Sequence, residues 1–314
     1  MRRALVLLAL LLVPASQAAR QGGTPVALVT AERQNQLLVV GLPDGRIERR
    51  FRMPADPQNV EANQNVAVVV STRAGAVTLL DTRRLRVIRV FRGFRSPHIA
   101  ALSRNGDFAY VTDDARGQLV VIGLARRRIL TRLFVGFGAH HMSFRPGHHE
   151  LWIVMGERAR SIHIVDTTHA AAPRPRGWFS PPGGGLMHDV AFAPDGRLWI
   201  AYDDRLTISV VDPRTRRLLF TRAAGSPPQH VAFGRFAYVT SGNDGRLRVF
   251  SNAGRLIGTA ATPRGSFNLG LGGGLVLTPS LTQGTLTELT ESGRRVASAE
   301  VASAARDAAL VVLP

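Results

Sequence analysis

The chain of 314 residues contains no cysteine. Disulfide bonds, thiolate metal ligands and cysteine nucleophiles are therefore excluded, and no lipid can be attached to a cysteine near the N-terminus. The folded protein must take its stability from the packing of its core.

Lysine is also absent, so all 40 basic residues are arginines, and with 22 acidic residues the formal net charge is +18. Such a charge raises the question of nucleic-acid binding. Aromatic residues make up only 6% of the chain, however, and they do not alternate with basic residues as base-stacking surfaces require. We interpret the exclusive use of arginine as a codon preference and expect no nucleic-acid partner. Contact of the arginine-rich turns with anionic polymers of a cell envelope stays open.

Long hydrophobic runs are scarce. The run Ala4 to Val13 is too short to span a membrane easily. Two arginines precede it and small residues follow it, which is the pattern of a secretory signal peptide cleaved after Ala18 or Ala19. We predict that residues 1–19 are a signal peptide and that the mature chain is exported, without a transmembrane segment.

Turn-forming residues are abundant, with 31 glycines and 18 prolines spread along the chain. Between them, pairs of short apolar runs recur with a period of about 40 residues, which predicts a β-propeller of four-stranded blades. A polar residue opens the first run of each unit. The seven such residues are Asn59, His98, His141, Asp189, His230, Asn268 and Asp307.

The two ends of the chain complement each other. The unit that begins at Val26 lacks a first strand, whereas Arg306 to Val312 forms a first strand with no followers. We predict that the C-terminal strand completes the N-terminal blade and leaves no open blade edge. Residues 20–314 then form one all-β domain, a seven-bladed β-propeller, which we expect to be a monomer.

One interval between units is longer than the others. The segment 169–187 is rich in alanine, proline and glycine and contains Trp178 and Phe179. Two interpretations fit: a tolerated surface insertion, or a flap beside the central opening that carries an exposed aromatic pair.

The runs Tyr110-Val111-Thr112 and Tyr238-Val239-Thr240 resemble the repeat of the secreted YVTN (YncE-like) β-propeller proteins, although Asp113 and Ser241 replace the repeat's asparagine. At the level of the fold the chain is also similar to WD40-like propellers and to those of quinoprotein dehydrogenases, nitrous-oxide reductases and lactonases. The resemblance implies a secreted propeller scaffold, and it does not specify an activity.

In a propeller the first strand of each blade lines the central axis, so the seven repeated polar residues are expected around one mouth of the channel. Three hypotheses apply: they satisfy backbone groups between blades, they bind a small molecule or peptide, or they bind a metal. The loops between second and third strands add Asp113, Asp114, Glu157, Asp203, Asp204 and Asp244 on this side. Many arginine-rich turns are expected on the opposite side, together with His148 and His149.

Neutral imidazoles are good ligands for zinc and copper. The residues expected to converge at the mouth are His98, His140, His141, His188 and His230. An oxygen-rich calcium site is an alternative, as the lactonase resemblance implies. Its ligands would be Asn59, Asp189, Asn268 and Asp307.

The sequence lacks a Gly-x-Ser-x-Gly elbow, a His-Glu-x-x-His motif and a phosphate loop. It therefore favours a secreted binding or scaffold protein whose ligand or envelope partner sits at the mouth. A metal-dependent hydrolase, lyase or oxidoreductase that uses copper, zinc or calcium at the same ring is the alternative.

Overall fold

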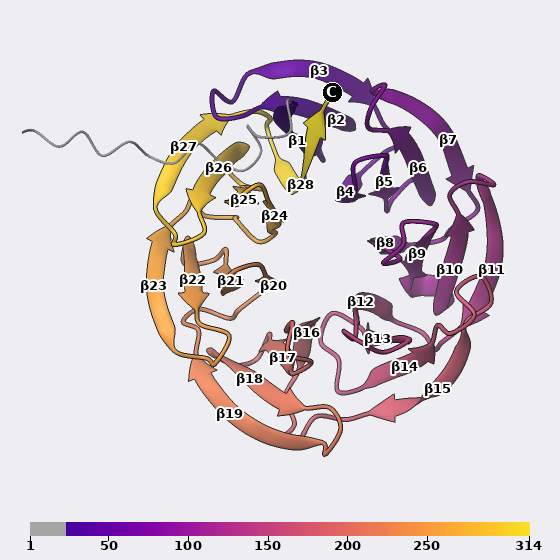
Figure 1. Cartoon of the computed structure of the whole chain (residues 1–314), viewed down its shortest axis with the longest axis vertical. Coiled ribbons are helices and arrows are strands. Elements are labelled where there is room, and N and C mark those ends of the chain that lie inside the picture. The colour runs from indigo at the N-terminus through magenta and orange to yellow at the C-terminus, as the bar shows by residue number, and fades with distance from the viewer. Residues whose placement is uncertain (1–22) are drawn as a thin grey trace, which may run out of the picture.

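The computed structural model describes residues 23–314, which form seven four-stranded antiparallel sheets in a ring around a central channel (Figure 1). The predicted seven-bladed β-propeller is confirmed. Within this range the helical content is one 3-10 turn, η2 (Asp114–Arg116), and no described helix could cross a bilayer. The predicted signal peptide, residues 1–19, lies outside the described residues and stays a prediction.

Each blade is given below from its innermost strand, at the channel, to its outermost strand. In six blades this is also the order along the chain, and in the first blade the C-terminal strand β28 is innermost. The first three blades are β28 (Ala305–Leu313), β1 (Thr24–Ala31), β2 (Gln36–Gly41), β3 (Ile47–Arg52); β4 (Pro57–Ala62), β5 (Val66–Ser71), β6 (Ala76–Asp81), β7 (Arg86–Arg92); and β8 (Pro97–Leu102), β9 (Phe108–Asp113), β10 (Gln118–Gly123), β11 (Arg128–Phe134). The next two are β12 (Ala139–Phe144), β13 (Glu150–Met155), β14 (Ile162–Asp166), β15 (Arg174–Phe179); and β16 (Met187–Phe192), β17 (Leu198–Tyr202), β18 (Thr207–Asp212), β19 (Arg217–Ala223). The last two are β20 (Val231–Phe233), β21 (Ala237–Ser241), β22 (Arg246–Phe250), β23 (Leu256–Ala261); and β24 (Gly270–Gly272), β25 (Leu275–Pro279), β26 (Thr285–Thr290), β27 (Arg295–Glu300).

The ring closes through the two ends of the described chain. Strand β28 pairs antiparallel with β1, in a register that runs from Thr24 opposite Leu313 to Ala31 opposite Ala305. The predicted closure is therefore confirmed. Because the innermost strand of this blade comes from the C-terminus, β1 is paired on both edges and each of the seven described blades has four strands.

The second and third strands of the blades are apolar because neighbouring blades cover both of their faces. In β5 and β6 every residue is buried, whereas the outermost strand β3 is mostly exposed. The hydrophobic clusters accordingly lie between blades. One of them joins Val68 and Val70 of β5 to Ala109 and Val111 of β9.

The Tyr-Val-Thr runs contribute hydrogen bonds that explain their residue types. The hydroxyl of Tyr110 donates to the carbonyl of Ala170 in the next blade at 2.8 Å, and that of Tyr238 donates to the carbonyl of Glu291 at 3.0 Å. In the same blade as Tyr238, the hydroxyl of Thr240 accepts the backbone N–H of His230 at 3.1 Å. The tyrosine thus ties adjacent blades together, and the threonine holds the start of the innermost strand.

The segment 169–187 is not an insertion or a flap. Its centre is β15, the outermost strand of its blade, which pairs with β14. Proline is tolerated there because an outermost strand needs ladder hydrogen bonds on one edge only. The prediction was wrong because Pro173, Pro175 and Gly177 obscured the strand pattern.

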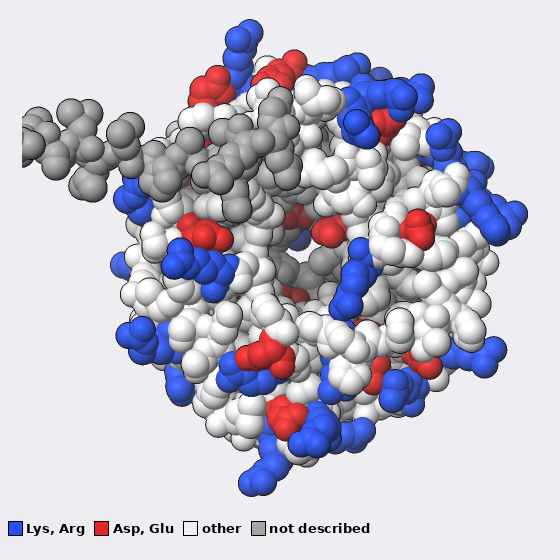
Figure 2. Space-filling view, viewed as in Figure 1, with Lys and Arg blue, Asp and Glu red and all other residues white. Residues whose placement is uncertain are grey.

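On the face shown in Figure 2, arginines are distributed around the ring with acidic side chains between them. The expected separation of acidic and arginine-rich faces is not found, because loops on the mouth side carry ion pairs. These pairs are Arg158–Asp203, Arg205–Asp204, Arg248–Asp244 and Arg306–Glu32. The mouth therefore lies among charges of both signs.

Candidate functional site

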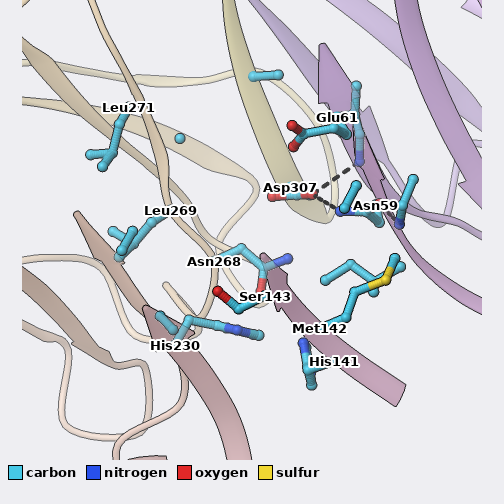
Figure 3. A pocket seen from close by; sticks show the side chains of 18 of the residues that line it. Asn59, Glu61, His141, Met142, Ser143, His230, Asn268, Leu269, Leu271 and Asp307 are labelled. Atoms are coloured by element: carbon cyan, nitrogen blue, oxygen red, sulfur yellow. Dashed lines mark hydrogen bonds between the residues drawn. The ribbon is translucent and has the colours of Figure 1, made fainter. Parts of the chain in front are cut away.

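The central channel contains two cavities. The mouth cavity has a volume of about 480 Å³ and is lined by all five histidines of the predicted metal set. The inner cavity has a volume of about 440 Å³, and Glu61, Ser143 and Asp307 project into it (Figure 3). His141 and His230 line both cavities, so the imidazoles lie at the boundary between them.

The histidines converge because the innermost strands begin with an irregularity. His98 and His188 lie on β8 and β16, and His140 and His141 are consecutive on β12. The pairing of each of these strands with the next shifts register at this point. A bulge breaks the alternation of side chains, which allows both His140 and His141 to face the mouth. His230 comes directly before β20.

His141 lies at the centre of the cluster. Its ring centroid is 5.0 Å from that of His98 and 4.8 Å from that of His140, which stack on each other at 3.6 Å. It is also 5.2 Å from the ring centroid of His188 and 4.7 Å from that of His230. Ligand nitrogens lie within 4.8 Å of one another in two groups. The groups are His98, His140 and His141, and His141, His188 and His230.

Two carboxylates lie behind the imidazoles. Nδ1 of His140 is 2.9 Å from the carboxylate of Asp114, and that of His230 is 3.5 Å from the carboxylate of Asp189. A carboxylate that is hydrogen-bonded to a histidine, as Asp114 is to His140, holds the hydrogen on Nδ1 and leaves Nε2 as a free lone pair. In many protein metal sites a carboxylate accepts the second ring N–H of a metal-bound histidine in this way.

The cluster favours neutral imidazoles. Burial lowers the pKa of His98 and His141 well below the usual value and that of His188 to about 3, and the neighbouring histidines add to the effect. His141 is only 4% exposed and His188 8%. Nδ1 of each is buried without a hydrogen-bond partner among the described residues. Such unsatisfied nitrogens are costly unless a ligand or water binds them.

Three of the other predicted residues engage neighbouring blades. The side chain of Asn59 accepts the N–H of Ala100 at 2.8 Å and donates to Asp307 at 2.8 Å. The carboxylate of Asp189 accepts the N–H of Val231 at 3.0 Å. These contacts are the blade-to-blade hydrogen bonds of the first hypothesis. Asn268 lines both cavities.

Glu61 was not among the predicted site residues, although it lies two residues after Asn59 on β4 and lines the inner cavity. The alternation of side chains along a strand could have identified it. Burial, with a smaller contribution from the charge of Asp307, raises the pKa of Glu61 to about 7.

We expect Glu61→Gln to stabilise the protein above neutral pH. Because the folded-state pKa is raised from 4.5 to about 7, the stability linked to protonation is complete below pH 4.5 and lost as pH rises through 7. Glutamine removes this loss, which for a partly hydrated group amounts to about 1–3 kcal/mol. Urea unfolding at pH 5 and pH 8 measures it. The exposed Glu300→Gln is the control, and an equal effect of Glu61→Gln at both pH values would contradict the assignment.

The chain resembles solved propellers in fold. It covers 99% of a functionally unknown protein from Desulfotomaculum acetoxidans, with 92% of this chain aligned, a TM-score of 0.76 and 13% identity. It covers 98% of apo AztD from Citrobacter koseri, with 92% of this chain aligned, a TM-score of 0.72 and 12% identity. It covers 74% of the dihydro-heme d1 dehydrogenase NirN, solved in complex with DHE, with 90% of this chain aligned, a TM-score of 0.63 and 14% identity.

No protein-family model matches the chain, and no curated protein matches it by sequence. The similarities above therefore concern the propeller fold alone. The resemblance to the YVTN proteins stays a prediction.

Proposed function

We propose that this protein is a binding module that holds a transition-metal ion, zinc or copper, in the histidine cluster at the channel mouth. The observation that carries the proposal is the pair of buried Nδ1 atoms, on His141 and His188, that lack a hydrogen-bond partner among the described residues 23–314 and belong to a cluster of five imidazoles. Neutral imidazole nitrogen is a preferred ligand of both metals.

The geometry is compatible with metal binding after small side-chain rotations. Nitrogens within 4.8 Å of one another need only modest movement to approach a common ion at about 2.0–2.1 Å. Calcium prefers oxygen ligands, but oxygens of Asp189 and Asp307 already accept backbone N–H groups. The nitrogen set is therefore the better supported of the two metal hypotheses.

The mouth cavity supports a binding role. A volume of about 480 Å³ in front of the imidazoles leaves a coordination position accessible to a small ligand or to a partner that exchanges the ion. NirN, with which this chain shares the fold, was solved in complex with DHE, a precedent for ligand binding by this architecture. An open coordination position is also what a metal-dependent enzyme requires.

Metal titration tests the proposal. We expect metal-free protein to bind Zn²⁺ or Cu²⁺ in calorimetry with a dissociation constant of micromolar or lower. His141→Ala removes the central ligand and should weaken binding at least about 100-fold, or roughly 2.7 kcal/mol. The double variant His148→Ala/His149→Ala, on exposed residues outside the cluster, should bind like the parent protein. Absence of binding in the parent, or unchanged affinity in His141→Ala, would refute the proposal.

A further inference from the structure

Five histidines exceed what one ion needs. Zinc sites in proteins are almost always four-coordinate, and sites that exchange ligands keep one position open. The five rings here form two triads that share His141. The first triad contains His98 and His140, and the second contains His188 and His230.

Each triad has its own carboxylate. Asp114 is 2.9 Å from Nδ1 of His140 in the first triad. Asp189 is 3.5 Å from Nδ1 of His230 in the second triad and 3.8 Å from Nδ1 of His141. Carboxylates in this position orient metal-bound imidazoles and strengthen them as ligands. A single ion would use one triad and leave the other carboxylate–histidine pair without a bound metal.

His141 is placed to serve both triads. It is buried, its Nδ1 has no hydrogen-bond partner among residues 23–314, and its ring centroid is 4.7–5.2 Å from those of the four other histidines. An imidazole presents its two nitrogens in different directions, so each can bind a different ion. We propose, on the premise that the cluster binds metal, that the mouth holds two transition-metal ions bridged by the His141 ring.

The protons balance in this arrangement, and most of the charge of the two ions is offset. Binding of the second ion would release the ring N–H proton of His141 to solvent, and the resulting imidazolate would place one negative charge between the two cations. Asp114 and Asp189 add one negative charge behind each triad. Because opposite charges within a few ångströms attract strongly in a partly buried site, these three groups reduce the repulsion between the ions.

Copper titration of the full chain tests the two-ion site. We expect two Cu²⁺ per chain by elemental analysis after removal of free metal. Two bridged Cu²⁺ ions couple magnetically, so the integrated electron paramagnetic resonance signal should be well below the copper content. His98→Ala and His188→Ala each disrupt one triad, and each should retain one copper with a fully integrated signal. His148→Ala/His149→Ala should behave like the parent.

The outcomes separate this inference from the proposed function. One tightly bound copper per chain in the parent would overturn the two-ion site and leave metal binding intact. Two coppers with a fully integrated signal would overturn the bridge through His141. No bound copper or zinc would overturn both proposals. Circular dichroism of each variant shows that a lost ion reflects a lost ligand rather than a lost fold.

Discussion

Deleting residues 306–314 is expected to abolish cooperative folding of the propeller. The deletion removes nearly all of β28, which forms the innermost strand of the blade that contains both ends of the described chain. Strand β1 then exposes the edge that pairs with β28 from Thr24 to Ala31. The cluster around Leu28 and Val39 also loses Val311. Since a domain is stable by only about 5–15 kcal/mol, we expect most of that stability to disappear.

Thermal unfolding followed by circular dichroism checks this expectation. The parent should show one cooperative transition, and the truncated chain should show none or aggregate through its exposed edge. Removal of the exposed Pro314 alone, which lies beyond β28, is the matched control and should leave the transition unchanged. A truncated chain with the melting temperature of the parent would show that closure by β28 is dispensable.

The fold was predictable because each blade has a local sequence pattern that repeats along the chain. Nearly continuous apolar runs such as Val66 to Val70 mark strands covered on both faces, and they recur with the spacing of a propeller. The missing first strand at one end and the extra strand at the other predicted the closure. Strand β15 was not predicted, because an exposed outermost strand needs neither an apolar run nor backbone hydrogen bonds on both edges. Arg174 and Pro175 illustrate this.

The site was only partly predictable, because residues at one repeat position do different work. Asn59 and His141 hold the same position in β4 and β12, but the short amide of Asn59 reaches the backbone N–H of Ala100, whereas the ring of His141 packs among the other imidazoles. In β8 this position is held by Ile99, and the predicted His98 lies one residue earlier. The repeat predicts the place of a side chain around the mouth. The contact that this side chain makes depends on the side chain's length, on its hydrogen-bonding groups and on the bulge in the strand. The spacing of the repeat does not determine these.

Asp307 combines a repeat position with the closing strand, and Asp307→Ala is expected to be strongly destabilising. The buried carboxylate accepts hydrogen bonds from the side chain of Asn59 at 2.8 Å, the N–H of Val60 at 2.9 Å and the N–H of Ala308 at 3.0 Å. Alanine leaves these donors without an acceptor in the interior. Since each buried unsatisfied group costs about 1–3 kcal/mol, we expect a loss of about 3–5 kcal/mol in urea unfolding.

A double-mutant cycle distinguishes this structural role from a role in ligand binding. Asp307→Ala and Asn59→Ala should be non-additive by about 1–2 kcal/mol, because either substitution breaks the same hydrogen bond. Asp307→Asn, which keeps one oxygen and the side-chain volume, should lose less stability than Asp307→Ala. Because Asp307 belongs to neither histidine triad, folded Asp307→Asn should also bind zinc or copper like the parent. Loss of metal binding in that variant at unchanged stability would show that Asp307 is part of the metal site rather than a residue of the blade junction alone.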